Sequence, residues 1–230
     1  MACFGGMIRS WVLLFSVVFS ALQFALGVTD PRDIYAINSL YTSLGSPPLP
    51  GWISTEGDPC GQPNWQGVQC VNANITSIIL SGANLGGGLG NDLGSFASII
   101  TIDLSNNNIG GIIPSNLPIT LKNFSLSDNQ ITGNLPDTLS ILGQLTDLFL
   151  SNNKLTGSIP DAFEQLKELV NMDLSGNSLV GQLPSSMGNL SSLTTLHLQN
   201  NQLSGMLDVL QDLPFIDLYC SSSLCDSLLF

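Results

Sequence analysis

The chain has 230 residues, of which only 10% are charged, and its 17 acidic and 5 basic side chains give a formal net charge of −12. A field of this sign repels phosphate backbones and anionic lipids, so nucleic acid and membrane surfaces are unfavourable partners. A basic peptide or protein is a compatible partner, although the same charge could serve only solubility.

The first 27 residues have the features of a targeting segment. They contain no acidic residue, one arginine (Arg9), an apolar stretch at 11–20, and small residues at Ala25 and Gly27. We predict a secretory signal peptide cut after Gly27 rather than an uncleaved anchor, because the apolar run is short and Gln23 interrupts it. No later apolar run reaches about twenty residues, so we expect a secreted, extracellular chain with no membrane span.

Cysteine usage and glycosylation motifs agree with export. Beyond the signal segment the cysteines are even in number, which suits disulfides in an oxidising compartment: Cys60, Cys70, Cys220 and Cys225. The sequence leaves open whether Cys220 and Cys225 pair with each other, pair between chains or remain unpaired. Three N-x-S/T motifs predict glycan acceptors at Asn74, Asn123 and Asn189.

Residues 28–74 are predicted to form an N-terminal cap that opens with a helix. Asp30 is expected to be the N-cap, Pro31 the first helical residue, and Asp33 the second member of a box-like capping pair. Apolar residues then recur at helical spacing and predict a face that packs on the first repeat: Ile34, Ile37, Leu40, Tyr41 and Leu44.

Residues 75–218 repeat the pattern L-x-x-L-x-L-x-x-N-x-L-x-G-x-I/L-P, as about six full units and a partial seventh. The first positions of the units are Ile75, Ile99, Leu121, Leu145, Leu169, Leu193 and Phe215, at intervals of 24 or 22 residues. This period is typical of leucine-rich repeats, and the L-x-G-x-I/L-P segment resembles that of their plant-specific class. We therefore predict an α/β solenoid with short parallel strands on its concave face, followed by a divergent C-terminal tail at 219–230.

Within each unit, alternation of period two separates inward from outward side chains. Leu148 and Leu150 are predicted to point inward, and Asp147, Phe149 and Ser151 outward. An asparagine at the ninth position is expected to bond the backbone groups that the turn leaves unpaired, at Asn107, Asn129, Asn153, Asn177 and Asn201. Ala83 occupies this position in the first unit, so this asparagine ladder is expected to begin in the second.

The outward positions of the strands predict a binding surface on the concave face. The candidate ligand-binding residues are Asp103, Asp147, Phe149, Asn171, Asp173, Thr195, His197 and Gln199. Phe149 is either an anchor for a peptide ligand or a lone aromatic that packs on a neighbouring side chain. A glycan at Asn123 would lie on this face and would restrict ligands to the C-terminal half or a flank.

Catalysis is not expected. His197 is the only histidine, no Ser/His/Asp or His/Cys constellation surrounds it in the sequence, and Asp103 and Asp173 fall in separate repeats. We therefore assign no catalytic residue, no metal ligand and no cofactor.

The cap contains Trp52, Asp58-Pro59-Cys60 and Trp65-Gln-Gly-Val-Gln-Cys70, which resembles the N-terminal cap of plant leucine-rich repeat receptors. That resemblance implies a disulfide between Cys60 and Cys70. Further segments narrow the resemblance to the ectodomain of the Strubbelig receptor family, plant receptor-like kinases with an atypical kinase domain: Thr29-Asp-Pro-Arg-Asp33, Ser46-Pro-Pro-Leu-Pro-Gly-Trp52 and Leu207-Asp-Val-Leu-Gln-Asp-Leu-Pro214.

The family resemblance implies a cell-surface recognition module in developmental signalling, with a protein or peptide ligand, a co-receptor ectodomain, or both as partners. This chain departs from the family after Leu218, where the expected Pro-rich segment, membrane span and kinase are not found. We therefore expect a soluble or truncated receptor that is not an enzyme. The alternatives are a fragment of a full-length transmembrane receptor kinase and a secreted leucine-rich repeat enzyme inhibitor.

Overall fold

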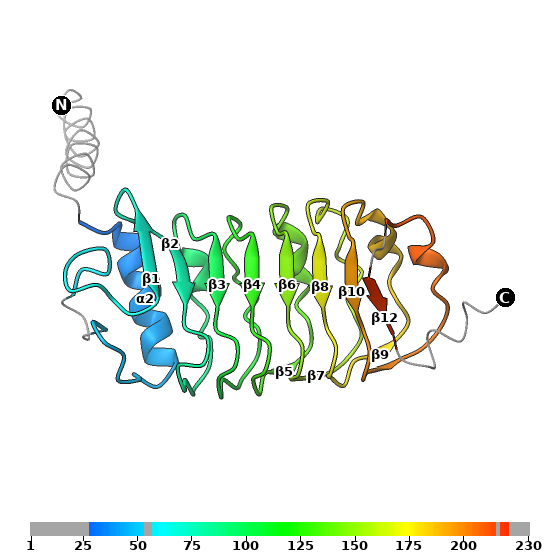
Figure 1. Ribbon diagram of the computed structural model, residues 1–230, viewed down its shortest axis with the longest axis horizontal. Helices are drawn as coiled ribbons and strands as arrows, with labels where there is room; N and C mark the ends of the chain where they lie inside the picture. Colours follow the sequence, from blue (N-terminus) through cyan, green and yellow to red (C-terminus); the bar gives the residue numbers. More distant parts are fainter. Residues whose placement is uncertain (1–27, 53–56, 215–216, 221–230) are drawn as a thin grey trace, which may run out of the picture.

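A computed structural model of the protein describes residues 28–52, 57–214 and 217–220. Its strands lie side by side along the long axis, from helix α2 at one end to strand β12 at the other (Figure 1). The predicted signal peptide, Phe215 and Cys225 lie outside the described residues.

One sheet of eight strands forms the body of the protein, in the order β1-β2-β3-β4-β6-β8-β10-β12. Its strands are β1 (Val68–Val71), β2 (Asn74–Ile79), β3 (Thr101–Asp103), β4 (Asn123–Ser125), β6 (Asp147–Phe149), β8 (Asn171–Asp173), β10 (Thr195–His197) and β12 (Asp217–Tyr219). β1 pairs antiparallel with β2, and every later neighbour in this sheet pairs in parallel. Each repeat thus contributes one strand, which confirms the predicted leucine-rich repeat solenoid.

Short elements complete each coil away from the main sheet. Two small parallel sheets join β5 (Thr132–Gly133) to β7 (Lys154–Leu155), and β9 (Val180–Gly181) to β11 (Gln202–Leu203). Four 3-10 turns also occur in the described residues, at η1 (Leu93–Ser95), η2 (Asp137–Ile141), η3 (Ser185–Asn189) and η4 (Asp208–Leu210). These elements lie on the segments that return the chain from one strand of the main sheet to the next.

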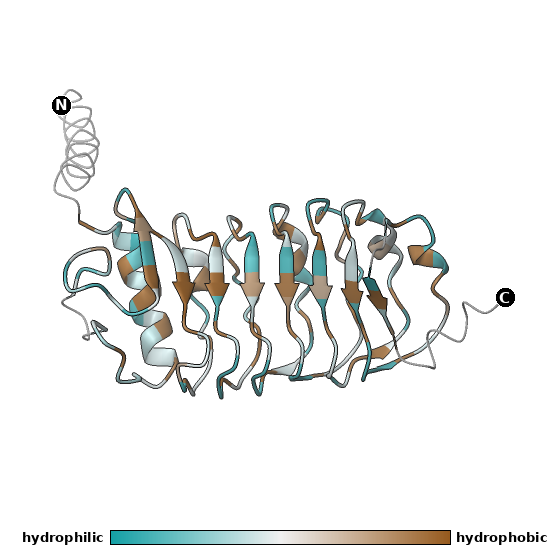
Figure 2. Cartoon of the chain, viewed as in Figure 1, coloured by the Kyte–Doolittle hydropathy of each residue, from teal (hydrophilic) through white to brown (hydrophobic). Residues whose placement is uncertain are grey.

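The core is a continuous column of inward side chains. The six described first positions are all 0% exposed, and so are Leu148 and Leu150, as the alternation predicts. Single strands of the main sheet contain both hydrophobic and hydrophilic residues (Figure 2). Because a single coil cannot cover its own apolar side, burial depends on stacking with the coils above and below.

The predicted asparagine ladder is present and links successive coils. Asn153 Oδ1 accepts a hydrogen bond from the Ile131 amide at 2.9 Å, and its Nδ2 donates to the carbonyls of Leu126, Leu150 and Ser151 at 2.9, 3.2 and 3.1 Å. Equivalent bonds are made by Asn107, Asn129, Asn177 and Asn201. The ladder satisfies buried backbone groups that the turns leave unpaired.

The cap helix α2 (Pro31–Ser43) begins as expected, with Pro31 in the first turn and the Asp30 side chain accepting from the Arg32 amide at 2.8 Å. Ile37, Leu40 and Leu44 are buried on its apolar face. At the other end of the helix, Gly87 has φ +67°, and a Cβ there would lie 2.2 Å from the Ser43 carbonyl oxygen. This glycine therefore permits the close approach of the first repeat to the end of the helix.

The capping role predicted for Asp33 is wrong. Its side chain is 0% exposed, and its two carboxylate oxygens accept hydrogen bonds from the amides of Ile75 at 2.6 Å and Ala97 at 2.7 Å. The Asp30 amide instead donates to the Ala73 carbonyl at 2.9 Å. Asp33 points into the interior, where it ties the helix to the first repeat and to the segment that leads into the second.

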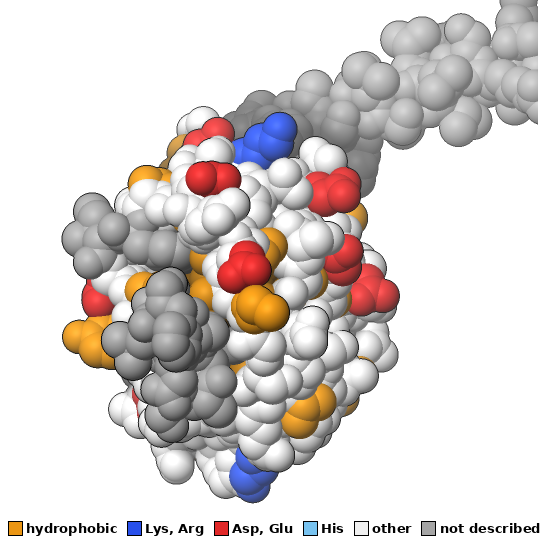
Figure 3. Space-filling model, turned by 90° about the vertical axis from the view of Figure 1, so that its right-hand side faces the viewer, with side chains coloured by type: hydrophobic (Ala, Val, Ile, Leu, Met, Phe, Trp, Pro, Cys, Tyr) orange, Lys and Arg blue, Asp and Glu red, His pale blue; other side chains and the backbone are white. Residues whose placement is uncertain are grey.

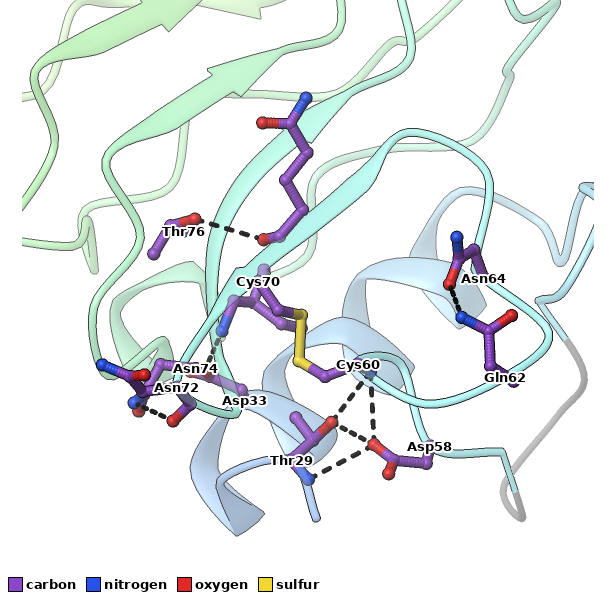
Figure 4. The surroundings of a disulfide bond; sticks show 12 residues. Thr29, Asp33, Asp58, Cys60, Gln62, Asn64, Cys70, Asn72, Asn74 and Thr76 are labelled. Carbon is purple, nitrogen blue, oxygen red and sulfur yellow. Dashed lines mark hydrogen bonds between the residues drawn. A yellow bond between two sulfur atoms is a disulfide. The ribbon is translucent and has the colours of Figure 1, made fainter. Parts of the chain in front are cut away.

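A disulfide between Cys60 and Cys70 closes the cap, as the family resemblance implies, with a Cα–Cα distance of 5.7 Å (Figure 4). Beside it, the Cys60 amide donates to Thr29 Oγ1 at 2.9 Å and to Asp58 Oδ1 at 3.2 Å, and the Thr29 hydroxyl bonds the same aspartate. The rings of Trp52 and Trp65 pack 5.1 Å apart between centroids and are nearly fully buried.

Removing the disulfide is expected to destabilise the cap. The closed loop spans 10 positions, and restoring its freedom in the unfolded chain costs about 3 kcal/mol of stability. A Cys60→Ser/Cys70→Ser double variant should therefore unfold at lower urea concentration, measured by the fluorescence of Trp52 and Trp65. Gln62→Ala, an exposed change inside the same loop, is the control and should leave the midpoint in place. An unchanged midpoint in the double variant would contradict the prediction.

The last described strand runs one residue further than expected. The predicted divergent tail begins at Tyr219, but Tyr219 is the final residue of β12 and pairs with His197. Cys220 follows directly and is disulfide-bonded. Figure 3 shows this end of the molecule, where acidic side chains are more frequent than basic ones on the visible face.

Candidate ligand-binding face

The outward side chains of the main sheet form the three columns that the sequence predicts, and we call this surface the sheet face. The strand register aligns Ser77, Thr101, Asn123, Asp147, Asn171, Thr195 and Asp217 in the first column, and Ile79, Asp103, Ser125, Phe149, Asp173, His197 and Tyr219 in the second. The third column follows each strand, with Ser81, Ser105, Ser127, Ser151, Ser175 and Gln199. All eight candidate ligand-binding residues therefore lie on one surface.

Phe149 lies in the middle of the second column. Its register partners on the neighbouring strands are Ser125 and Asp173, and its side chain is half-buried. Within the described residues it makes no ring contact with another aromatic side chain. Its ring edge and face are thus free of aromatic neighbours, although its role as an anchor stays a prediction.

Asp103 and Asp173 share one local geometry. In each, Oδ1 accepts from the amide and the hydroxyl of the serine two residues later: 3.0 and 2.7 Å from Ser105, and 2.9 and 2.6 Å from Ser175. These bonds hold both carboxylates in the same orientation. The two residues are three strands apart in the second column, so they are not a close carboxylate pair.

Asp147 and Asn171 lie side by side in the first column. Asn171 Nδ2 donates to Asp147 Oδ1 at 2.6 Å, and the Thr146 hydroxyl donates to Asp147 Oδ2 at 2.8 Å. Thr195 is the next member of the column. In the third column, Gln199 Oε1 is buried and has no hydrogen-bond partner among the described residues.

His197 is the centre of a cluster that includes two residues outside the predicted candidates. Its Nε2 lies 3.2 Å from Asp217 Oδ2, its Nδ1 lies 3.9 Å from Asp173 Oδ2, and its ring meets the edge of Tyr219 at a centroid distance of 4.9 Å. Asp217 and Tyr219 lie one repeat beyond the candidate ligand-binding residues. Extending the repeat interval by one unit predicts both positions.

In the described residues, the acidic side chains of the sheet face have few basic partners. No lysine or arginine occurs in any described strand of the main sheet. Arg32 forms an ion pair with Asp30 in the cap, and the His197 ring lies 3.9 Å from Asp173 Oδ2 and 3.2 Å from Asp217 Oδ2, contacts that are ionic only when the imidazole is protonated. Asp103 and Asp147 therefore have no cationic partner within the described part of the chain.

The predicted glycan acceptors occupy different surfaces. Asn123 lies on the sheet face in β4, where its Nδ2 is 3.5 Å from Thr101 Oγ1. Asn74 begins β2, and Asn189 is exposed at the end of η3. Glycan occupancy at all three positions stays a prediction.

A groove away from the sheet face is less suited to ligand chemistry. It has a volume of about 690 Å³ and lies between α2 and the first three repeats, lined in part by Arg32, Tyr35, Phe96, Ile119 and Ile141. Its one charged side chain, Arg32, is already paired with Asp30. The sheet face, with its aligned acidic and aromatic groups, is the better candidate.

Within residues 28–52, 57–214 and 217–220, no group of three or more histidine, cysteine or acidic side chains is placed to hold a metal ion. No helix within the described residues has the length and apolar character needed to cross a bilayer.

Three known protein families match parts of the chain. Residues 30–71 match the leucine rich repeat N-terminal domain, and residues 119–179 match a leucine rich repeat family. A second leucine rich repeat family matches at 98–118 and 192–213. These matches agree with the cap and the repeats described above.

Among curated proteins, the chain is 51% identical over 136 residues to protein Strubbelig-receptor family 3 of Arabidopsis thaliana, which covers 59% of this chain and 17% of that relative. Among solved structures, it is similar to the ectodomain of the Arabidopsis receptor kinase GASSHO1/SCHENGEN3 in complex with Casparian strip integrity factor 2, with a TM-score of 0.73, 30% identity, and coverage of 82% of this chain and 24% of that one.

A second solved structure is the Arabidopsis receptor kinase HAESA in complex with the peptide hormone IDA and the co-receptor SERK1. The TM-score is 0.54 at 32% identity, over 59% of this chain and 24% of that one. The chain thus spans about a sixth of its curated relative and about a quarter of these two receptor structures. The chain is a leucine-rich repeat protein with the N-terminal cap domain, closely homologous to the matched part of the Strubbelig receptor family.

Proposed function

We propose that this chain is a non-catalytic extracellular recognition module of the receptor-kinase type, which binds a protein or peptide on its sheet face. The observation that carries the proposal is the alignment of Asp147, Phe149, Asp173 and His197 on one surface. Half-buried aromatic groups beside fixed polar groups are typical of interface anchors. Similar solved ectodomains are bound to a peptide hormone and a co-receptor, which supports the same class of partner here.

We further propose export and cell-surface signalling as the setting of this module. The acid-free, apolar segment at 1–27 supports a secretory signal peptide, and the Cys60–Cys70 disulfide is suited to an oxidising compartment. Homology to the Strubbelig receptor family supports a role in developmental signalling, with glycans at the three N-x-S/T motifs. Intact-mass analysis of the protein secreted by plant cells would test cleavage after Gly27 and glycan occupancy together.

The proposed surface is tested by a capture experiment with matched variants. The secreted chain, its Phe149→Arg/Asp173→Lys variant and a flank variant, Val180→Arg/Asp208→Lys, would be immobilised and exposed to extracellular fluid from plant tissue. Val180 and Asp208 are exposed and lie outside the main sheet. The Phe149→Arg/Asp173→Lys variant introduces cations and loses an apolar contact, which should abolish binding at the sheet face. A specific partner should therefore be retained by the native chain and the flank variant only.

Hydrogen exchange should then locate the partner on the native chain. Protection is expected in β6, β8 and β10, because the altered side chains and their neighbours lie there. Equal capture by both variants, or protection confined to the groove beside α2, would contradict the proposed surface.

A further inference from the structure

The charges on the sheet face define the chemistry of its ligand more narrowly than the proposed function does. The second column contains Asp103, Ser125, Phe149 and Asp173 on four successive strands. Both carboxylates are held through Oδ1 by a serine two residues later, which leaves acceptor capacity on Oδ2. Asp103 has no cationic partner in the described residues, and Asp173 has only His197 Nδ1 at 3.9 Å.

The spacing of these carboxylates sets a distance along the solenoid. Asp103 and Asp173 are separated by three strand steps, and neighbouring strands lie about 4.8 Å apart, so their separation is about 14 Å. An extended peptide rises about 3.4 Å per residue, and its side chains alternate between two sides. A peptide lying across the strands would therefore place residues i and i+4 over the two aspartates, both facing the sheet.

An aromatic side chain, Phe149, lies between the two aspartates in the second column. Phe149 is one strand from Asp173 and two strands from Asp103, so residue i+2 of the same peptide would lie near its ring. An apolar side chain there would be removed from water against the ring. A cation over Asp173 would also be close enough to the Phe149 ring for a cation–π contact, which acts within about 6 Å.

We infer that the sheet face binds an extended peptide with basic residues at i and i+4 and an apolar residue at i+2. This inference rests on the proposed function and names its ligand class. Charge complementarity selects the occupant, because the strands of the main sheet carry aspartates and no lysine or arginine in their described residues. A second copy of this chain is disfavoured as the occupant by its own net charge of −12.

The spacing is tested with two synthetic peptides of identical composition. Fluorescein-labelled Gly-Arg-Gly-Leu-Gly-Arg-Gly places its arginines at i and i+4, and Gly-Arg-Gly-Leu-Arg-Gly-Gly places them at i and i+3. Fluorescence anisotropy at low salt with the full chain should show about tenfold tighter binding of the i,i+4 peptide, since two charge pairs and one aromatic contact form together. Added salt should weaken that binding.

Protein variants assign the preference to the two carboxylates. Asp103→Asn/Asp173→Asn should reduce binding of the i,i+4 peptide to the level of the i,i+3 peptide. Asp137→Asn/Asp208→Asn removes the same charge from exposed positions on 3-10 turns and should retain the tenfold preference. Repeating the titration in an Asn123→Gln background excludes obstruction by a glycan on β4.

Equal affinity for the two peptides, or an undiminished preference in Asp103→Asn/Asp173→Asn, would overturn the inference. Its failure is distinguishable from failure of the proposed function. If the capture experiment still depends on Phe149 and Asp173 while neither peptide shows the spacing preference, the sheet face is the binding surface for a ligand of other chemistry. If both experiments fail, the sheet face is not the binding surface.

Discussion

Replacing Asp33 by alanine is expected to lower the free energy of unfolding of the cap by about 4 kcal/mol. The side chain is 0% exposed and accepts from the buried amides of Ile75 and Ala97, at 2.6 and 2.7 Å. Alanine would leave both amides without a partner, and each buried unsatisfied group costs about 1 to 3 kcal/mol. Urea unfolding followed by the fluorescence of Trp52 and Trp65, both buried in the cap, would measure the loss.

Two variants sharpen this test. Asp33→Asn keeps one acceptor oxygen but turns an amide nitrogen toward the second backbone amide, so it should lose about half as much stability. Asp137→Ala removes an exposed aspartate from η2 and should change the free energy of unfolding by less than about 0.5 kcal/mol. Equal effects of the Asp33 and Asp137 changes would show that Asp33 does not tether the cap to the repeats.

The stability of the cap should also depend on pH through Asp33. Burial raises the pKa of this carboxyl, and the amides of Ala97 and Ile75 act in the opposite direction. Because the folded pKa lies above the unfolded value of about 4, the native protein should lose stability relative to Asp33→Asn as pH rises through the folded pKa. Below about pH 4 the difference should be constant. A relative gain of stability with rising pH would contradict this sign.

The second large effect is expected at Asn153 in the asparagine ladder. Asn153→Ala removes the bond from the Ile131 amide and three donations to carbonyls, in a position where the side chain is only 9% exposed. We expect a loss of about 3 kcal/mol in the free energy of unfolding of the repeats. Far-ultraviolet circular dichroism during urea unfolding would measure it, since the repeats contain most of the described strands.

Two further variants distinguish loss of the ladder hydrogen bonds from a general effect of replacing an asparagine. Asn134→Ala alters an exposed asparagine of the preceding coil and should cost less than about 0.5 kcal/mol. Asn153→Asp retains the acceptor for Ile131 but turns a charged oxygen toward the carbonyls, so it should be at least as destabilising as alanine. If Asn134→Ala and Asn153→Ala had equal effects, the ladder would not be a principal source of stability.

The candidate site could be predicted largely because it is periodic. Once the repeat unit is known, alternation along the strand assigns Asp103, Phe149 and Asp173 to one column, and the strand register confirms this. Asp217 and Tyr219 follow from the same rule in the seventh repeat, beyond the eight candidate residues. Their contacts with His197 also join side chains of different repeats, 20 or more positions apart, which local alternation does not specify.

The repeat, the side of the sheet on which each side chain lies and the asparagine ladder can all be predicted from the amino-acid sequence, because they follow from local periodicity and from stacking of similar units. The role of Asp33 depends instead on long-range packing. Its position after Asp30 and Pro31 suggests a capping pair, but its partners are amides 42 and 64 positions away. A buried carboxylate bonds whichever unpaired amides the packing brings to it, and sequence spacing does not show which amides those are.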